Sequence, residues 1–309
     1  MATSNSYDFN LDRDAIITEA YSLIGAVAIG TTPSPAQLTG GGQSLNLMLK
    51  GWQAVGFGLW LRKEVTLHLG YGTTSYLLGP SGDNASETAI KTEMKVAASS
   101  TDLTIDVDSI TGMTDGDYIG VELDDGTLQW TTINGTPSGN TVTIAAALTD
   151  DVAIDNHVYT YTTKIQRPLS IIEARIIDAS DIEIPVEIVS RDIYMALPTK
   201  TTTGYINQIY YDPQLTNGVL YTWPACDNVQ RRIKMTVKKP IMDFDATDDD
   251  GEFPQEWFEA VTTNLAIRLG IKNGIPIDPE LKALATESKW MLMSFDDEKE
   301  SMFLQPKYS

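Results

Sequence analysis

The spacing of apolar residues changes twice along this chain of 309 residues, and the change limits the folds it can adopt. Near both ends the apolar residues recur every three or four positions, the period of an α-helix with one buried face. In the middle they alternate with polar residues, the period of a strand with one buried face. The sequence therefore predicts helices at the two ends and strands between them.

Two helices are predicted in the N-terminal part. The first runs from Asp12 to about Val27, where a turn rich in glycine and proline follows. The second ends at Val55. It begins at Pro35 or at Ser44, because the three consecutive glycines between these two positions are costly inside a helix.

The middle of the chain favours strands. Residues 59–79 are typical of a β-hairpin, because glycines separate two strand-like runs. Residues 95–165 hold five short alternating runs and no helical pattern, which indicates a small all-β barrel or sandwich. Residues 166–240 continue with further extended segments.

The C-terminal part returns to the helical period. Pro254 suits the first turn of a helix that ends near Asn273-Gly274. A last helix begins at Asp278 or Pro279, and its pattern continues to about Phe303.

The predicted fold class is α+β. We expect a helical bundle built from the N- and C-terminal helices, with a short β-sheet region and an inserted all-β domain. Residues 1–94 would form the N-terminal part of the helical domain together with the hairpin. Residues 95–165 would form the insertion, and residues 166–309 the remaining strands, the closing helices and the tail.

Net charge restricts the possible partners. The formal net charge is −20, so the chain is not expected to grip nucleic acid by neutralising phosphates, although DNA could pass beside it without sticking. The charge is uneven: residues 95–165 hold 11 acidic and 2 basic side chains, whereas residues 166–239 hold 8 and 9. Such asymmetry can steer copies of one protein together, but it also serves solubility alone.

Compartment is indicated by features that the sequence lacks. It has no apolar run of about 18 residues, so no membrane span is expected. Its polar first residues do not have the pattern of a signal peptide. The single cysteine, Cys226, cannot form an intrachain disulfide. We therefore expect the chain to fold in a cytoplasm.

Catalytic and metal-binding patterns are weak. His68, His157 and Cys226 lie far apart in the sequence, so no nucleophile and base are paired by spacing. The sequence contains no Walker A, Cys-x-x-Cys or His-Glu-x-x-His motif. Placing Gly251 of the acidic run at the EF-hand glycine puts an alanine and a tryptophan at ligand positions, so a solvated loop is the better interpretation. We expect no enzyme activity, no cofactor and no metal.

Two stretches resemble the head-to-tail adaptors, or tail-tube-like connectors, of podovirus-type phages. The first comprises residues 21–25 (YSLIG), 45–52 (LNLMLKGW) and 58–60 (GLW). The second comprises residues 210–215 (YYDPQL), 220–225 (LYTWPA), 240–245 (PIMDFD) and 253–260 (FPQEWFEA). With the segments between them they cover roughly two-thirds of the chain, and residues 95–165 lie outside.

The resemblance implies a structural virion protein without catalytic residues, located at the portal–tail junction and assembled in the host cytoplasm. It implies a ring of about a dozen copies around the DNA exit channel, docked beneath the portal protein and joined to tail nozzle or fibre proteins. It also implies a C-terminal tail that clasps the portal. The residues that match this docking role in position and character are Phe295, Met302, Phe303, Leu304 and Tyr308.

Contacts between copies are expected at the strand around residues 231–239. There alternation places basic side chains on one face, where acidic residues of a neighbour could meet them, although a solvated strand face explains the pattern equally well. The candidate inter-subunit residues are Arg231, Arg232, Lys234, Lys238 and Lys239.

An alternative function also fits the sequence. The protein could be a tail-associated carbohydrate-binding or host-recognition protein acting through the β insertion, where Trp130, Tyr159 and Tyr161 could form a sugar platform. Aromatic residues at strand spacing are more often part of a core. A tail-associated hydrolase would need a pair of carboxylates in a cleft, which abundance of acidic residues alone does not indicate.

Overall fold

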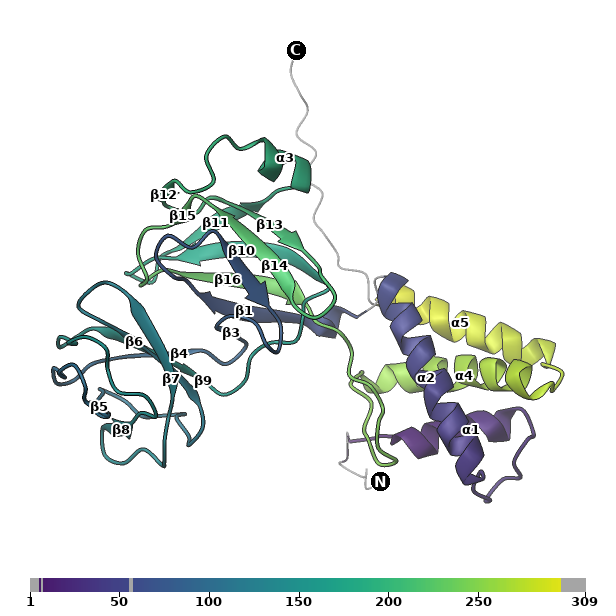
Figure 1. The fold of residues 1–309 in the computed structure, drawn as a ribbon. Helices are drawn as coiled ribbons and strands as arrows, with labels where there is room; N and C mark the ends of the chain where they lie inside the picture. Colours follow the sequence, from purple (N-terminus) through teal and green to yellow (C-terminus); the bar gives the residue numbers. More distant parts are fainter. Residues whose placement is uncertain (1–5, 7, 56–57, 296–309) are drawn as a thin grey trace, which may run out of the picture. The chain divides into compact units, whose positions relative to one another are not determined.

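The chain folds into two compact units. The structure is a computed structural model that describes residues 6, 8–55 and 58–295. The helical unit is formed by the residues up to Leu61 and from Ile241 onward, and the β unit by Arg62–Pro240 (Figure 1). Helices and strands are thus combined, as the sequence predicts. The division differs from the predicted segments because strands on both sides of the insertion belong to one sheet.

The helical unit joins segments from the two ends of the described chain. Its helices are α1 (Arg13–Leu23), α2 (Pro35–Val55), α4 (Phe258–Asn273) and α5 (Pro279–Phe295), with short 3-10 turns η1 (Leu59–Leu61) and η2 (Gln255–Trp257). All four α-helices contribute to one buried core. The core is rich in aromatic residues, and Trp257 packs edge-on against both Trp52 and Trp60.

Helix α1 begins as predicted and ends earlier. The Asp12 carboxylate caps it by accepting the backbone N–H of Ala15 at 2.7 Å. The helix stops at Leu23, because Gly25 adopts a left-handed conformation with φ of +68°. The apolar residues up to Val27 continue the pattern beyond the helix, and Val27 packs against the same core.

Helix α2 runs through the three glycines and begins at Pro35. Close packing against α1 is the reason: a Cβ added at Gly41 would lie 2.6 Å from Ile17 Cγ2. The Lys272 ammonium donates a hydrogen bond of 2.9 Å to the Gly40 carbonyl. Glycine destabilises a helix, but here it allows two helix backbones to approach closely, which a larger side chain would prevent.

The C-terminal helices end and begin where the sequence places them. Helix α4 ends at Asn273, and Gly274 follows with the left-handed φ of +69°. Helix α5 begins at Pro279, and the Asp278 carboxylate accepts the N–H of Glu280. The predicted extension of this helix to Phe303 lies outside the described residues.

The acidic run before α4 is a hydrogen-bonded loop. One carboxylate oxygen of Asp249 accepts the backbone N–H groups of Asp245 and Ala246, each at 2.6 Å. The Asp249 carbonyl accepts the N–H of Arg13 at the start of α1. Asp249 therefore uses its oxygens to shape the loop and to anchor it on α1.

The β unit is organised around an eight-stranded sheet with the order β2-β14-β13-β11-β10-β16-β1-β3. The strands are β1 (Arg62–His68), β2 (Ser75–Leu78), β3 (Ala85–Ser86), β10 (Ser170–Ile177), β11 (Glu183–Ile188), β13 (Gln208–Asp212), β14 (Gly218–Trp223) and β16 (Arg232–Lys238). Helix α3 (Arg191–Ala196) and a small sheet of β12 (Thr203–Gly204) and β15 (Ala225–Cys226) complete this part.

The predicted hairpin at residues 59–79 is wrong. Its two runs do form strands, β1 and β2, but these lie far apart in the sheet order. Strand β1 pairs with β16 and β3, whereas β2 pairs with β14. Strand β16 pairs with β1 over seven residues, more than the four residues of β2 could offer, and β2 pairs along its whole length with β14. Local turn chemistry does not decide such long-range pairing.

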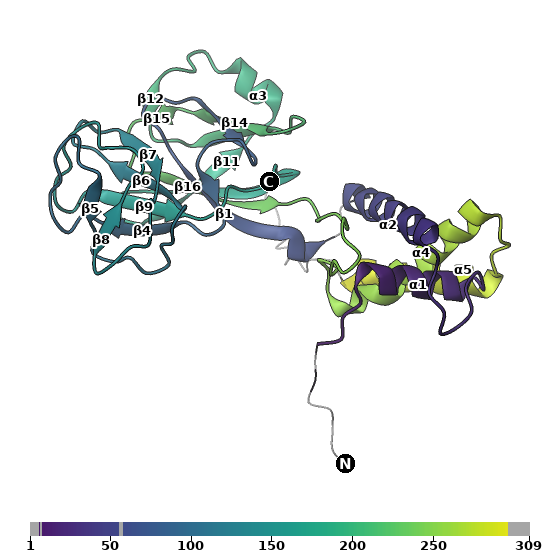
Figure 2. The same cartoon turned by 60° about the horizontal axis from the view of Figure 1, so that its bottom comes forward.

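The insertion is an all-β body with its own core (Figure 2). The five predicted strands are present as β5 (Thr104–Asp106), β6 (Tyr118–Glu122), β7 (Leu128–Thr132), β8 (Thr141–Thr143) and β9 (His157–Tyr161), and β4 (Ile90–Glu93) joins them. The sheets β4-β9-β6-β7 and β5-β8 are connected by bridges Met94–Val107 and Ile133–Ile144. The pairing therefore closes on itself, which corresponds to the barrel among the two predicted forms.

Substitution of Gly41 by alanine tests the close α1–α2 contact. The added methyl group would press on Ile17, so Gly41→Ala should lower the free energy of unfolding by about 1–3 kcal/mol. Gly51→Ala in the same helix is the matched control, since nothing lies within 4 Å of its new methyl group. This control should raise stability by up to about 1 kcal/mol. Urea unfolding followed by helical circular dichroism measures both changes, and equal effects would contradict the contact.

Candidate interaction surfaces

The two histidines and the cysteine have structural surroundings within the β unit. His68 is buried against aromatic rings, with ring centroids 4.6 Å from Tyr159 and 5.1 Å from Trp130. Burial, and secondarily the positive charge of Arg232, lowers the pKa of His68 to about 3. His68 is therefore neutral at ordinary pH and is a poor general base.

His157 and Cys226 are likewise engaged with nearby groups. His157 Nδ1 lies 3.1 Å from a carboxylate oxygen of Glu122. Burial raises the pKa of Glu122, but hydrogen bonds from His157 and Gln230 outweigh it and leave the pKa below its usual value. The Cys226 thiol is buried and donates to the carbonyl of Asn228, and burial raises its pKa. A thiol of this kind is not activated for attack.

The predicted basic face of β16 is largely satisfied by carboxylates of the same chain. Lys234 Nζ lies 3.1 Å from Glu64 and 3.6 Å from Glu183, and Arg232 forms an ion pair with Asp181. Arg231 pairs with Asp227 and stacks on Tyr205. Lys238 lies on the same strand and Lys239 directly follows it. Their role between copies stays a prediction, and ion pairs within the chain already explain the first three.

A polar cavity lies where the barrel meets the large sheet of the β unit. It has a volume of about 290 Å³ and is lined mainly by charged and aromatic groups of β1, β4, β9 and β16. Its lining includes the charged residues Glu64, Glu87, Lys91 and Arg232 and the aromatic residue Tyr159. The Arg232 guanidinium lies 5.3 Å from the centre of the Tyr159 ring, a cation–π contact. The cavity thus offers hydrogen-bonding groups of both signs beside an aromatic ring.

The aromatic residues proposed as a sugar platform mostly face inward. Tyr159 and Tyr161 are almost completely buried, and Tyr161 packs against Trp130 and Tyr118. Trp130 itself is half-buried and lies over Gly120, where an added Cβ would be 2.8 Å from its ring. These residues therefore pack as a core around His68 and do not form an open platform.

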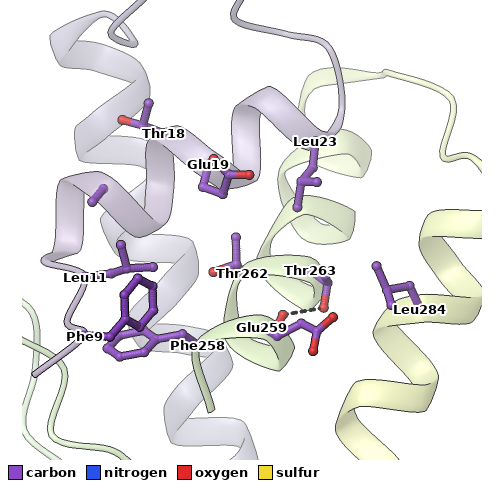
Figure 3. A pocket seen from close by; sticks show the side chains of 11 residues that line it. Phe9, Leu11, Thr18, Glu19, Leu23, Phe258, Glu259, Thr262, Thr263 and Leu284 are labelled. Carbon is purple, nitrogen blue, oxygen red and sulfur yellow. Dashed lines mark hydrogen bonds between the residues drawn. The ribbon is translucent and has the colours of Figure 1, made fainter. Parts of the chain in front are cut away.

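The helical unit has an apolar groove of about 680 Å³ between α1, α4 and α5 (Figure 3). We call this surface the apolar groove, and its large apolar residues are Phe9, Leu11, Leu23, Phe258 and Leu284. Phe9 packs edge-on against Phe258 with ring centroids 5.8 Å apart, yet it remains 61% exposed. Leu23 and Leu284 are each 40% exposed.

Two carboxylates lie at the apolar groove. Glu19 of α1 and Glu259 of α4 belong to its lining and are exposed, and no basic residue is part of that lining. The groove therefore combines apolar walls with negative charge. This is a surface that favours a partner with apolar side chains and a cation.

A second apolar surface lies on the outer side of α5. The residues Pro279, Ala283, Thr286, Trp290 and Met293 follow one another at spacings of four, three, four and three, and all are exposed. We call them the α5 seam. This spacing is the coiled-coil period that keeps one stripe of a helix facing a partner. The core side of α5 is different and carries Ala285, Ser288 and Leu292.

The groove was not anticipated from the sequence, because its walls come from three helices distant in the chain. The seam could have been found by its spacing, but that pattern merges with the apolar core face of the same helix. Of the predicted portal-docking residues, Phe295 is the last residue of α5. Met302, Phe303, Leu304 and Tyr308 lie outside the described residues, as does the side chain of Phe295.

The described residues show neither a metal site nor a membrane-spanning helix. Among them no group of three or more His, Cys, Asp or Glu side chains is arranged to hold a metal ion. Within the same residues, no helix has both the length and the hydropathy needed to cross a bilayer.

Comparison with known proteins gives partial structural likeness. No family model matches the sequence, and no curated protein matches it. A tailspike of Acinetobacter baumannii bacteriophage AP22, solved with a capsular saccharide, is 15% identical with a TM-score of 0.21; the match covers 24% of this chain and 14% of the tailspike. The tailspike of Pseudomonas phage LKA1 is 22% identical with a TM-score of 0.22, over 25% and 15% of the two chains. Scores this low carry no argument about function.

Burial of neutral His68 predicts a pH-dependent stability. The unfolded chain binds a proton at His68 below about pH 6.5, whereas the folded chain does not until about pH 3. The free energy of unfolding therefore decreases as the pH is lowered through this window, by about 1.4 kcal/mol per pH unit from this residue. In His68→Asn the slope between pH 6.5 and about 5 should be shallower by that amount. Urea unfolding followed by tryptophan fluorescence measures the slope, and an unchanged slope would contradict the assignment.

Proposed function

We propose that this chain is a structural subunit of a tailed-phage virion, an adaptor that forms a ring between the portal and the tail. The observation that supports the proposal best is the pair of distinct apolar surfaces on the helical unit, the apolar groove and the α5 seam. Exposed apolar surface of this kind is typical of protein–protein contacts. A subunit with two different docking surfaces can join its neighbours head to tail, and such contacts form a ring when the rotation between neighbours closes.

The sequence resemblance to phage adaptors supports the same proposal. The motif at residues 45–52 lies on α2, and several of its apolar residues are buried in the shared core of the helical unit. The motif at residues 253–260 leads through η2 into α4 of that same core. Both stretches therefore contribute to the unit that carries the two apolar surfaces.

Charge is compatible with a position around DNA. The chain has a net charge of −20, and residues 240–309 alone hold 15 acidic and 6 basic side chains. Carboxylates that face a channel repel the phosphate backbone, so DNA would slide past without binding to a specific sequence.

Assembly on a portal tests this proposal. The full-length chain mixed with the assembled portal of the same phage should give a ring of regular copy number in electron microscopy. Deleting residues 295–309 should abolish portal binding while circular dichroism stays unchanged. A full-length control with serines at positions 302, 303, 304 and 308 separates lost side chains from lost length. A chain that stays monomeric beside assembled portals would refute the adaptor function.

A second candidate function is recognition of carbohydrate by a tail protein. The polar cavity of the β unit supports it, because its charged groups of both signs could bind sugar hydroxyls. This site is at the base of the barrel and does not use the buried aromatic core as a platform.

Glycan binding by the full-length protein tests the second candidate. A glycan array should identify a ligand whose binding is lost in Glu87→Gln and Lys91→Met, two changes at the cavity. Asp125→Asn, on an exposed turn of the barrel remote from the cavity lining, is the control. Binding that survives both cavity changes would place the ligand elsewhere, and an array without any signal would count against the function.

A further inference from the structure

We propose that the α5 seam of one copy docks in the apolar groove of a second copy. This inference rests on the proposed function, since it names the contact through which a ring would form. The occupant of the groove is then another molecule of the same chain. The geometry of α5 and the charges at the two surfaces support this contact, and they determine the symmetry it allows.

The geometry of α5 prevents a copy from filling its own groove with its own seam. Leu284 belongs to the groove wall, and it lies on the same straight helix as the seam residues. At 3.6 residues per turn, every seam residue is rotated by about 100° or more from Leu284 around the helix axis. Both surfaces are therefore displayed at once, in different directions, and each needs a separate partner.

The chemistry of the two surfaces is complementary. The seam contributes a large exposed aromatic side chain, Trp290, which is 67% exposed, together with smaller side chains at one-turn spacing. Lys282 is exposed beside the seam, and both belong to the same open depression on α5. At the groove the charged side chains are Glu19 and Glu259. Docking would place a cation near these two carboxylates while apolar groups fill the groove.

One acidic residue beside the seam opposes this pairing. Glu287 also belongs to the depression around Trp290. It lies five positions from Lys282, about 140° further around the helix, so the two charges point to different sides. The orientation that brings Lys282 toward the groove carboxylates therefore directs Glu287 away from them, which fixes one of the two possible orientations of the helix.

The symmetry that follows is head-to-tail. The groove and the seam are different surfaces, so the contact is heterologous: each copy offers a groove to one neighbour and a seam to the other. Such a contact gives a ring when the rotation between neighbours closes, and an open filament when it does not. Pairing of two identical surfaces would instead stop at a closed dimer.

Single substitutions at exposed positions measure the contact in the full-length protein. Trp290→Ser removes the aromatic group of the seam, and Leu23→Arg places a cation in the groove, opposite the neighbour's Lys282. Each should weaken self-association on the order of tenfold or more, as loss of a central interface residue does. Leu47→Ser on α2 is the matched control, because Leu47 is 70% exposed and belongs to neither surface. Sedimentation velocity and native mass spectrometry give the association constants, and circular dichroism verifies folding.

Mixing the two variants tests the head-to-tail character. The Trp290→Ser chain keeps an intact groove and the Leu23→Arg chain keeps an intact seam. At concentrations where each variant alone is monomeric, an equimolar mixture should therefore form a one-to-one heterodimer and nothing larger. A charge exchange tests the orientation: Lys282→Glu should weaken association, and combination with Glu19→Lys and Glu259→Lys should restore it.

The outcomes separate this contact from the adaptor function. If the Trp290→Ser or the Leu23→Arg variant forms rings as well as the wild-type protein does, the contact is overturned and the adaptor function remains intact. A wild-type protein that stops at a closed dimer, or a mixture that gives no heterodimer, would also overturn it. A wild-type chain that remains monomeric beside assembled portals would refute the adaptor function itself.

Discussion

The antiparallel pairing of β1 with β16 is the contact on which the rest of this structure depends. Seven residues of each strand pair in register, from Arg62 opposite Lys238 to His68 opposite Arg232. The chain leaves the helical unit just before β1 and returns to it just after β16. Because these two ends of the β unit are neighbours in one sheet, helices from the two ends of the described chain can share one core.

The same pairing positions the chemistry of the β unit. Strand β16 brings Arg232 and Lys234 beside β1, where Glu64 accepts one of the cations and His68 is covered by the barrel aromatics. Ion pairs at the surface contribute little energy each, so the buried side of the strand, with Ile233 and Met235, supplies most of the stabilisation. The charged side then selects which strand lies next to which, since a shifted register would separate these charges.

The sequence predicted those elements whose signals are local. The start of α1 at Asp12, the end of α4 at Gly274 and the five barrel strands each depend on a few neighbouring residues, and each lies where it was expected. Predictions that required knowledge of distant partners were wrong or incomplete. The runs at residues 59–79 resembled a hairpin, but their strands pair with the distant β16 and β14. The glycines of α2 resembled a helix break, but close packing on Ile17 explains them.

The same difference between local and long-range signals applies to the candidate sites. The basic strand face could be predicted from alternation alone, but the carboxylates that satisfy it come from β1, from β11 and from the turn after β10. The apolar groove has walls from α1, α4 and α5, so no local pattern reveals it. The α5 seam is visible in the sequence as a repeat of four and three residues, yet only the buried positions of the same helix show that the seam faces outward.

The two units therefore differ in whether their candidate contact residues already have partners within the same chain. In the β unit the described cations Arg231, Arg232 and Lys234 have acidic partners within the chain, so ionic contacts between copies would have to compete with them. In the helical unit, the described residues leave the apolar groove and the α5 seam exposed. A net charge of −20 makes copies repel one another, and this repulsion is screened at physiological salt beyond about 8 Å. In the proposed contact, association of the copies would therefore be driven by short-range apolar burial, which screening does not weaken, with charge selecting the orientation.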